Sequence, residues 1–218
     1  MFEAELNGKD STITKYKDME DVLTSNVFGT LKNIDNYFLN FILKHNFDLD
    51  ANNDDLIINF WKRYDENIDR NCEPDVIISS NKFILFIEAK YGSEFGEDKG
   101  NTSRKIENQL VREYDTLCSL CEVNQHSYLL IITSDLSEPI EKIKTQFHPN
   151  SVPETVKWTS WQKINTGLKL SLHEYNKCKF SAKWIIQLCE LLDKKNLNEF
   201  SGFSRKFDEV TSWRGLGL

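Results

Sequence analysis

The chain has 218 residues, of which 39% are hydrophobic, and a formal net charge of −7. A chain of this length and composition can bury a substantial core, and it contains no apolar run close to the roughly 20 residues that cross a membrane. The acidic balance argues against a general nucleic-acid coat, because affinity for a phosphate backbone rests on excess Lys and Arg. The charge is unevenly spread, since residues 151–218 carry 11 Lys and Arg against 7 Asp and Glu. This basic third could face phosphates while the acidic remainder supplies metal ligands, or both could be ordinary solvated surfaces.

The five cysteines are an odd number without the spacing of a secreted disulfide framework. Cys118 and Cys121 form a close pair, but no second pair of Cys or His follows at zinc spacing. The polar, acidic N-terminus does not have the pattern of a signal peptide. We therefore expect core thiols and a soluble, cytoplasmic protein.

The N-terminal part of the chain is predicted to be a lead-in, residues 1–17, followed by one domain, residues 18–218. From Asp18 to Lys44 apolar residues recur at steps of three and four, which predicts one amphipathic helix or two helices broken near Gly29. Glu20 falls on the apolar face of this helix, where a lone carboxylate is costly to ionise. It is either a first-turn acid favoured by the helix dipole or part of a metal site.

Polar residues 48–55 and 65–72 are predicted to be loops on either side of a first strand, Leu56–Tyr64. Two short apolar runs follow, Val76–Ile78 and Phe83–Ile87, with a polar break between them. This pattern predicts a β-hairpin of mostly buried strands.

Three charges are set into this hairpin: Asp75 opens its first strand, and Glu88 and Lys90 close its second. Ionised groups avoid such strands unless they are paired or bind a metal. Residues two apart share a face of a strand, so Glu88 and Lys90 point the same way. A two-residue loop would place Asp75 diagonal to Glu88, and a four-residue loop would place it directly opposite. Either loop leaves the two carboxylates roughly 5 to 8 Å apart at Cβ, close enough to hold one cation, whereas an odd loop would separate them.

A loop punctuated by glycines, residues 92–100, follows Lys90, and loops beside a site often contact substrate. A helix is predicted next, from N-cap candidates at residues 101–103 to about residue 122.

Gln109, Arg112 and Glu113 lie at steps of three and four on that helix. They form either a solvated face or a cluster in which Gln109 and Arg112 lean over the hairpin and contact a substrate phosphate.

The remaining elements alternate between strands and helices, which completes an α/β pattern with a central mixed sheet flanked by helices. The sequence predicts strands at 127–133 and 156–161, a short helix at 137–147, and a helical C-terminal extension from about 162 with helices at 162–175 and 180–194.

The order of a helix with Glu20, a strand, the Pro74-Asp75 strand, the Glu88-Ala89-Lys90 strand, a helix and a strand resembles the PD-(D/E)XK nuclease superfamily. The resemblance covers about residues 18–161 and implies a restriction-endonuclease-like core. It also implies a metal-dependent nuclease that hydrolyses DNA, with RNA a weaker expectation.

By matching motifs, the resemblance assigns Asp75 and Glu88 as ligands of Mg²⁺, for which Mn²⁺ could substitute, and Lys90 to the attacking water. We expect the Ala89 carbonyl and, through water, Glu20 to complete the metal site. A general-base role for Lys90 would require a strongly depressed pKa, so an orienting role is favoured.

Other members of the superfamily carry a Gln and a Tyr four apart on the helix after the triplet, whereas here Gln109 and Tyr114 are five apart. Trp158–Trp161 and Phe200–Phe203 also resemble defence nucleases, which implies a role in restriction or defence against phage. A small domain that cuts both DNA strands would be expected to act as a homodimer. The alternatives are a catalytically idle nuclease-fold module for DNA binding or assembly, and a purely structural ion-pair network.

Overall fold

The computed structural model describes residues 17–51, 55–64, 72–95 and 108–199. The predicted lead-in therefore lies outside the described residues except for Lys17, and the Phe200–Phe203 motif lies outside them entirely. No helix among the described residues is long and apolar enough to span a membrane.

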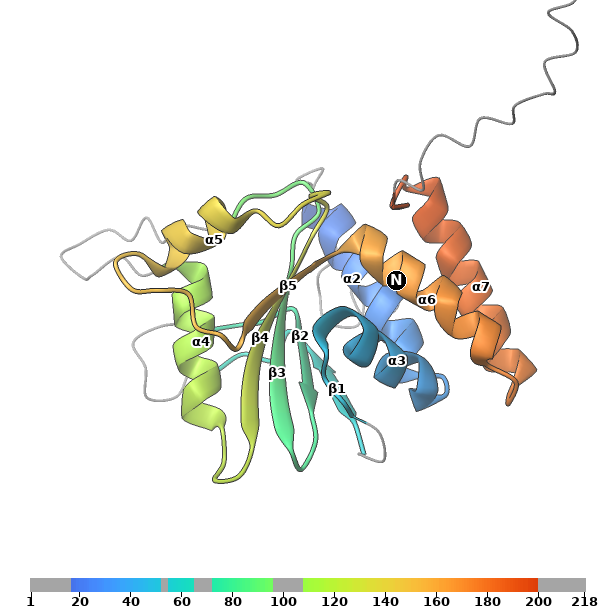
Figure 1. Ribbon diagram of the computed structural model, residues 1–218, viewed down its shortest axis with the longest axis horizontal. Helices are drawn as coiled ribbons and strands as arrows, with labels where there is room; N and C mark the ends of the chain where they lie inside the picture. The colour runs from blue at the N-terminus through green and yellow to red at the C-terminus, as the bar shows by residue number, and fades with distance from the viewer. Residues whose placement is uncertain (1–16, 52–54, 65–71, 96–107, 200–218) are drawn as a thin grey trace, which may run out of the picture.

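Five strands form one mixed sheet in the order β1-β2-β3-β4-β5 (Figure 1). β2 is antiparallel to both β1 and β3, whereas β4 is parallel to both β3 and β5. Their bounds are β1 Ile57–Phe60, β2 Val76–Ser79, β3 Phe83–Ala89, β4 His126–Thr133 and β5 Val156–Ser160. The predicted mixed sheet is thus confirmed, as is the hairpin made by β2 and β3.

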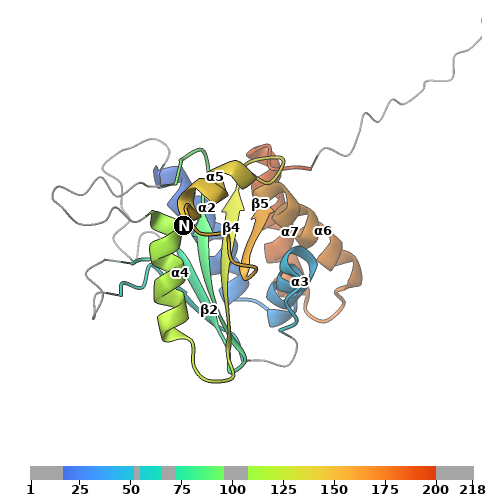
Figure 2. The same cartoon turned by 60° about the vertical axis from the view of Figure 1, so that its left-hand side comes forward.

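Helices cover both faces of this sheet (Figures 1 and 2). One face carries α2 (Lys17–Lys32), α3 (Asn36–Phe47), α6 (Trp161–Glu174) and α7 (Lys179–Lys194), and the other carries α4 (Gln109–Leu120) and α5 (Ile140–Phe147). Each face has its own hydrophobic cluster: Leu85 and Ile87 of β3 join the cluster under α2 and α3, and Phe86 joins the one under α4. By the alternation of the strand, Glu88 faces the α4 side.

The first predicted helical region is two helices, as one of the alternatives proposed, but the break lies at residues 33–35. The expected position near Gly29 was wrong, because Gly29 lies inside α2. Asp35 ends the break: its Oδ1 accepts a hydrogen bond from the Tyr37 amide at 2.9 Å and caps α3.

The described part of the helix after the hairpin is α4, which starts at Gln109 after Asn108, whose backbone is extended. The predicted start at residues 101–103 lies outside the described residues. The Asn108 side chain donates to the carbonyl oxygens of Thr145 and Gln146, at 3.2 and 3.0 Å. These bonds fix the N-terminal end of α4 against α5.

Three other element bounds differ from the prediction for local reasons. β1 ends at Phe60 because Trp61 has a φ of 45°, in the left-handed region that interrupts a strand. β5 ends at Ser160, which is the N-cap residue of α6. The Ser160 hydroxyl accepts a hydrogen bond from the Lys163 amide at 3.2 Å. α5 begins only after Pro139.

Candidate functional site

The register of the β2–β3 hairpin determines where its charged residues lie. Val76 pairs with Ile87 and Ser79 with Ile84. One further step in this register places Asp75 opposite Glu88, which is the arrangement predicted for a four-residue loop. The Asp75 carboxylate contacts the facing strand, where its Oδ2 accepts a hydrogen bond from the Ala89 amide at 2.9 Å.

Glu88 and Lys90 form the centre of the charged cluster. Glu88 is only 2% exposed, and its Oε1 accepts a hydrogen bond from Lys90 Nζ. Lys90 itself is buried just beyond the end of β3. Its carbonyl accepts from Trp161 Nε1 at 3.1 Å, so the first residue of the C-terminal helices braces this position.

Glu20 reaches the same cluster from the first turn of α2 and is 6% exposed. Its Oε1 lies 3.4 Å from Lys90 Nζ. Its Oε2 accepts from the Tyr91 amide at 2.7 Å and from the Ser93 hydroxyl. Glu20 therefore fixes the chain that leaves β3 and contacts Glu88 through Lys90. The inward orientation predicted from its helical position is confirmed.

On the opposite side of the sheet, α4 brings Gln109 to the cluster. Gln109 Nε2 donates to Glu88 Oε1 at 2.5 Å and to Glu113 Oε1 at 3.0 Å. The solvated-face alternative is wrong for Glu113, which is 2% exposed. Sequence reasoning assigned Glu113 no role, although the signal was present: it lies three residues after Leu110 and four before Leu117, both on the buried stripe of α4.

The crowding of carboxyl groups has electrostatic consequences. Burial and then the charge of Glu88 raise the pKa of Asp75 well above its ordinary value. The same two causes, in the same order, raise the pKa of Glu113. Asp75 and Glu113 therefore hold their protons more readily in this cluster than they would in water.

Lys90 is the cation that balances these acids. Burial on its own would lower the pKa of Lys90, but the carboxylates around it, Glu88 first, outweigh that effect and raise the pKa above its ordinary value. The surrounding carboxylates thus favour the ammonium form of Lys90, which can orient or stabilise negative groups.

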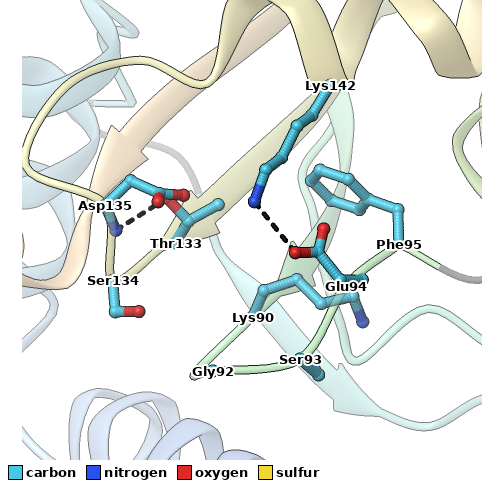
Figure 3. A pocket seen from close by; sticks show the side chains of 9 residues that line it. All are labelled: Lys90, Gly92, Ser93, Glu94, Phe95, Thr133, Ser134, Asp135 and Lys142. Carbon is cyan, nitrogen blue, oxygen red and sulfur yellow. Dashed lines mark hydrogen bonds and ion pairs between the residues drawn. The ribbon is translucent and has the colours of Figure 1, made fainter.

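A small pocket of about 100 Å³ opens beside Lys90 at the carboxyl ends of β3 and β4 (Figure 3). Polar groups dominate its wall, and Lys142 of α5 reaches across it to Glu94 at 3.0 Å. Its lining residues are Lys90, Gly92, Ser93, Glu94, Phe95, Thr133, Ser134, Asp135 and Lys142. The carboxyl ends of parallel strands are where ligands of open α/β sheets usually bind.

Arg112 and Tyr114 are the two other residues of α4 that the sequence analysis considered. Burial raises the pKa of the Cys72 thiol to about 12. The positive charge of Arg112 partly offsets that rise. Contact between Arg112 and a substrate phosphate stays a prediction. The Tyr114 hydroxyl lies 3.2 Å from Thr155 Oγ1, before β5, so it does not join Gln109.

No group of three or more His, Cys, Asp or Glu residues among those the structure describes is arranged to hold a metal ion. The predicted ligands Asp75 and Glu88 do face each other, while Glu20 lies beyond Lys90. Ala89 is fully buried at the end of β3, and a role for its carbonyl stays a prediction. Comparison with protein-family models and with curated proteins found no match for this chain.

Proposed function

We propose that this protein is a metal-dependent nuclease that hydrolyses phosphodiester bonds of DNA. The observation that carries the proposal is the hairpin geometry: Asp75 faces Glu88 across two paired strands, and Lys90 follows on the same face. Three ionisable groups at the end of buried strands are costly unless they serve a purpose. The order α2, antiparallel β1–β3, α4 and parallel β4 also supports a restriction-endonuclease-like core.

The donor set fits a hard divalent cation. Three carboxyl groups, those of Glu20, Asp75 and Glu88, act on one lysine, and Glu113 lies next to Glu88. Burial, and then the charge of Glu88, raise the pKa values of Asp75 and Glu113. All-oxygen ligands favour Mg²⁺, with Mn²⁺ as a substitute. Asp75 and Glu88 would hold the ion. A bound ion would lower the pKa of a water molecule and neutralise charge that develops on the scissile phosphate.

Lys90 supplies a fixed positive charge beside that position. Because it stays protonated, it acts by orienting the attacking water or by stabilising the negative phosphate in the transition state. Glu20 holds Lys90 from one side while Glu88 holds it from the other. Glu20 is accordingly a positioning residue for the lysine and for the loop that begins at Tyr91.

The pocket beside Lys90 is suited to the phosphate backbone of the substrate. Ser93, Ser134 and Lys142 bring hydroxyl and ammonium donors to its wall, and such donors bind phosphate oxygens. Cleavage of both strands of a duplex would call for two copies of the chain, one for each strand.

The proposal is tested by incubating the purified protein with plasmid and with single-stranded DNA in Mg²⁺, in Mn²⁺ and in EDTA. We expect cleavage that depends on the metal and is lost in Lys90→Ala. A matched control is Lys183→Ala, an exposed lysine of α7, which should cleave as the wild type does.

Two other outcomes would favour the alternatives. Binding of DNA without cleavage in any metal would favour an idle binding or assembly module. The ion pairs of Lys90 with Glu20 and Glu88 are also compatible with a structural network. That reading would be supported if Lys90→Ala unfolded the protein while metal changed neither stability nor any activity on DNA.

A further inference from the structure

Two lysines of the C-terminal helices lie over aromatic rings near the carboxyl end of the sheet. Lys163, in the first turn of α6, has its Nζ 5.0 Å from the centroid of the Trp158 ring. Lys195, the C-cap residue of α7, has its Nζ 5.6 Å from the centroid of the Tyr91 ring. An ammonium group over a ring is attracted to it and keeps its full positive charge. Neither lysine forms an ion pair with a carboxylate among the described residues, so both can bind an anion.

The two aromatic rings connect these lysines to the candidate site. Tyr91 directly follows Lys90 in the chain. Trp158 Nε1 donates a hydrogen bond to Thr133 Oγ1 at 3.1 Å, and Thr133 lines the pocket beside Lys90. Each lysine therefore contacts a ring that adjoins a residue of the site, and both lie at the rim of the site.

The C-terminal end of α7 has a fixed geometry that positions Lys195. Asn196 has a φ of 58°, and the Leu197 amide donates to the Leu192 carbonyl at 3.0 Å, as in a Schellman motif. The buried Asn165 side chain of α6 donates to the Leu197 carbonyl at 2.8 Å. These bonds tie the end of α7 to α6 and hold the backbone from which the Lys195 side chain extends.

Lysines from both layers of helices reach this edge of the sheet. Lys142 belongs to α5 on one face, whereas Lys195 ends α7 on the other (Figure 1). Asp193, the acid nearest to Lys195 in the sequence, pairs with Lys169 at 2.6 Å. The edge therefore presents positive charge from both faces of the sheet. This arrangement fits a ligand whose negative charges repeat along a chain, such as the phosphate backbone of a nucleic acid.

We propose that Lys163 and Lys195 bind the phosphates that neighbour the scissile phosphate in duplex DNA. This inference rests on the proposed nuclease function and specifies which part of the C-terminal helices contacts the substrate. The rings of Trp158 and Tyr91 hold the two ammonium groups at the rim of the site. Phosphate contacts of this kind fix the position of the DNA and take no part in bond cleavage.

The test is the binding of a fluorescein-labelled DNA duplex, followed by fluorescence anisotropy in EDTA at several salt concentrations. Each phosphate contact contributes about 0.9 to the slope of log K against log salt, which is about 8-fold in affinity between 1 M and 0.1 M salt. The double variant with Lys163→Met and Lys195→Met should therefore reduce the slope by about 1.8 and weaken binding about 60-fold at 0.1 M salt. Each single variant should reduce the slope by about 0.9, so the inference can be tested even if the double variant does not fold.

Lys177→Met is the matched control. Lys177 is an exposed lysine whose Nζ lies 5.9 Å from the centroid of the Tyr37 ring, in the segment that joins the end of α6 to the start of α7. It makes the same type of contact at the opposite end of these two helices, so its loss should leave the slope unchanged.

Two further measurements separate loss of charge from loss of structure. The double variant with Lys163→Arg and Lys195→Arg keeps both charges and can stack on the same rings, so it should retain the slope of the wild type. Methionine can also pack on aromatic rings, so the methionine variants should melt close to the temperature of the wild type. An unchanged slope in the methionine variants, an equal fall in Lys177→Met, or a wild type that does not bind the duplex would overturn the inference.

The inference and the nuclease proposal can fail separately. Cleavage of DNA by the wild type in Mg²⁺, together with an unchanged slope in the methionine variants, would refute the role of the two lysines and leave the nuclease standing. Reduced slopes in these variants without any cleavage by the wild type would establish the phosphate contacts and refute the nuclease.

Discussion

Replacing Lys90 by methionine tests whether this lysine is the charge that balances the site. Methionine keeps an unbranched side chain of similar length and lacks the ammonium group. The Lys90 and Glu20 side chains are 11% and 8% exposed, so solvent screens their ion pair little. Glu88, at 2% exposed, would lose the same cation.

The size of the effect follows from the geometry. For the charges of Lys90 and Glu20, which lie 3.4 Å apart, Coulomb's law at an effective dielectric of 20 gives about 5 kcal/mol. Part of that is offset by the cost of desolvating the lysine, and removing one partner of a buried pair typically costs about 3–5 kcal/mol. We expect Lys90→Met to lower the free energy of unfolding by about 4 kcal/mol in metal-free buffer.

Urea denaturation in EDTA, followed by tryptophan fluorescence, measures this loss. Lys183→Met on the exposed face of α7 is the matched control and should change the free energy by less than about 0.5 kcal/mol. Added Mg²⁺ should reduce the loss in Lys90→Met, because a divalent cation at Asp75 and Glu88 replaces the missing charge. A loss below about 1 kcal/mol would refute the view that Lys90 compensates the buried acids.

The other predictions concern the supporting residues. Glu20→Ala should lower the free energy of unfolding by about 3 kcal/mol, since Tyr91 and Ser93 lose a charged acceptor. Glu20→Gln should lower the free energy of unfolding by less. Equal losses of the two variants in urea denaturation would contradict this. The pKa values of Asp75 and Glu113 are raised in the folded state, so the stability they contribute is fully present below pH about 4 and falls as the pH rises through the raised values. Urea denaturation in EDTA at pH 5 and pH 8 should show this fall, and Glu113→Gln should reduce it; an unchanged slope would contradict the assignment. Lys142→Ala should weaken DNA binding and reduce the salt dependence of log K by about 0.9, measured by fluorescence anisotropy, while stability stays the same because its ion pair with Glu94 is exposed.

The hairpin shows what local sequence can and cannot determine. Apolar runs and misplaced charges were enough to predict β2, β3 and their acids, but both even loops were compatible with the pattern. The loop is selected by Ser80, whose hydroxyl accepts from the amides of Lys82 and Phe83 at 3.1 and 3.3 Å and whose own amide donates to the Phe83 carbonyl at 2.9 Å. Such competing turn bonds are not visible in hydrophobic periodicity.

The contacts between distant elements could be predicted only in part. The helical position of Glu20 indicated that it points inward, but its partners Lys90, Tyr91 and Ser93 lie about seventy residues away in the chain. Glu113 was within reach of the same periodic reasoning through Leu110 and Leu117. The neighbouring Gln109 and Arg112 indicate a polar face and so mask this signal in the sequence.

Cleavage by Asp75→Asn compared with the wild type tests the central claim most directly. The substitution keeps the size of the side chain and removes the carboxylate that faces Glu88, and Asp115→Asn makes the same change at an exposed position of α4. With supercoiled plasmid in Mg²⁺, we predict that the wild type and Asp115→Asn cut the DNA, and that Asp75→Asn does so at least about 100-fold more slowly, a loss of about 2.7 kcal/mol in transition-state stabilisation. Equal rates for Asp75→Asn and the wild type, or an absence of cutting by the wild type in both Mg²⁺ and Mn²⁺, would contradict the assignment of this hairpin as a nuclease site.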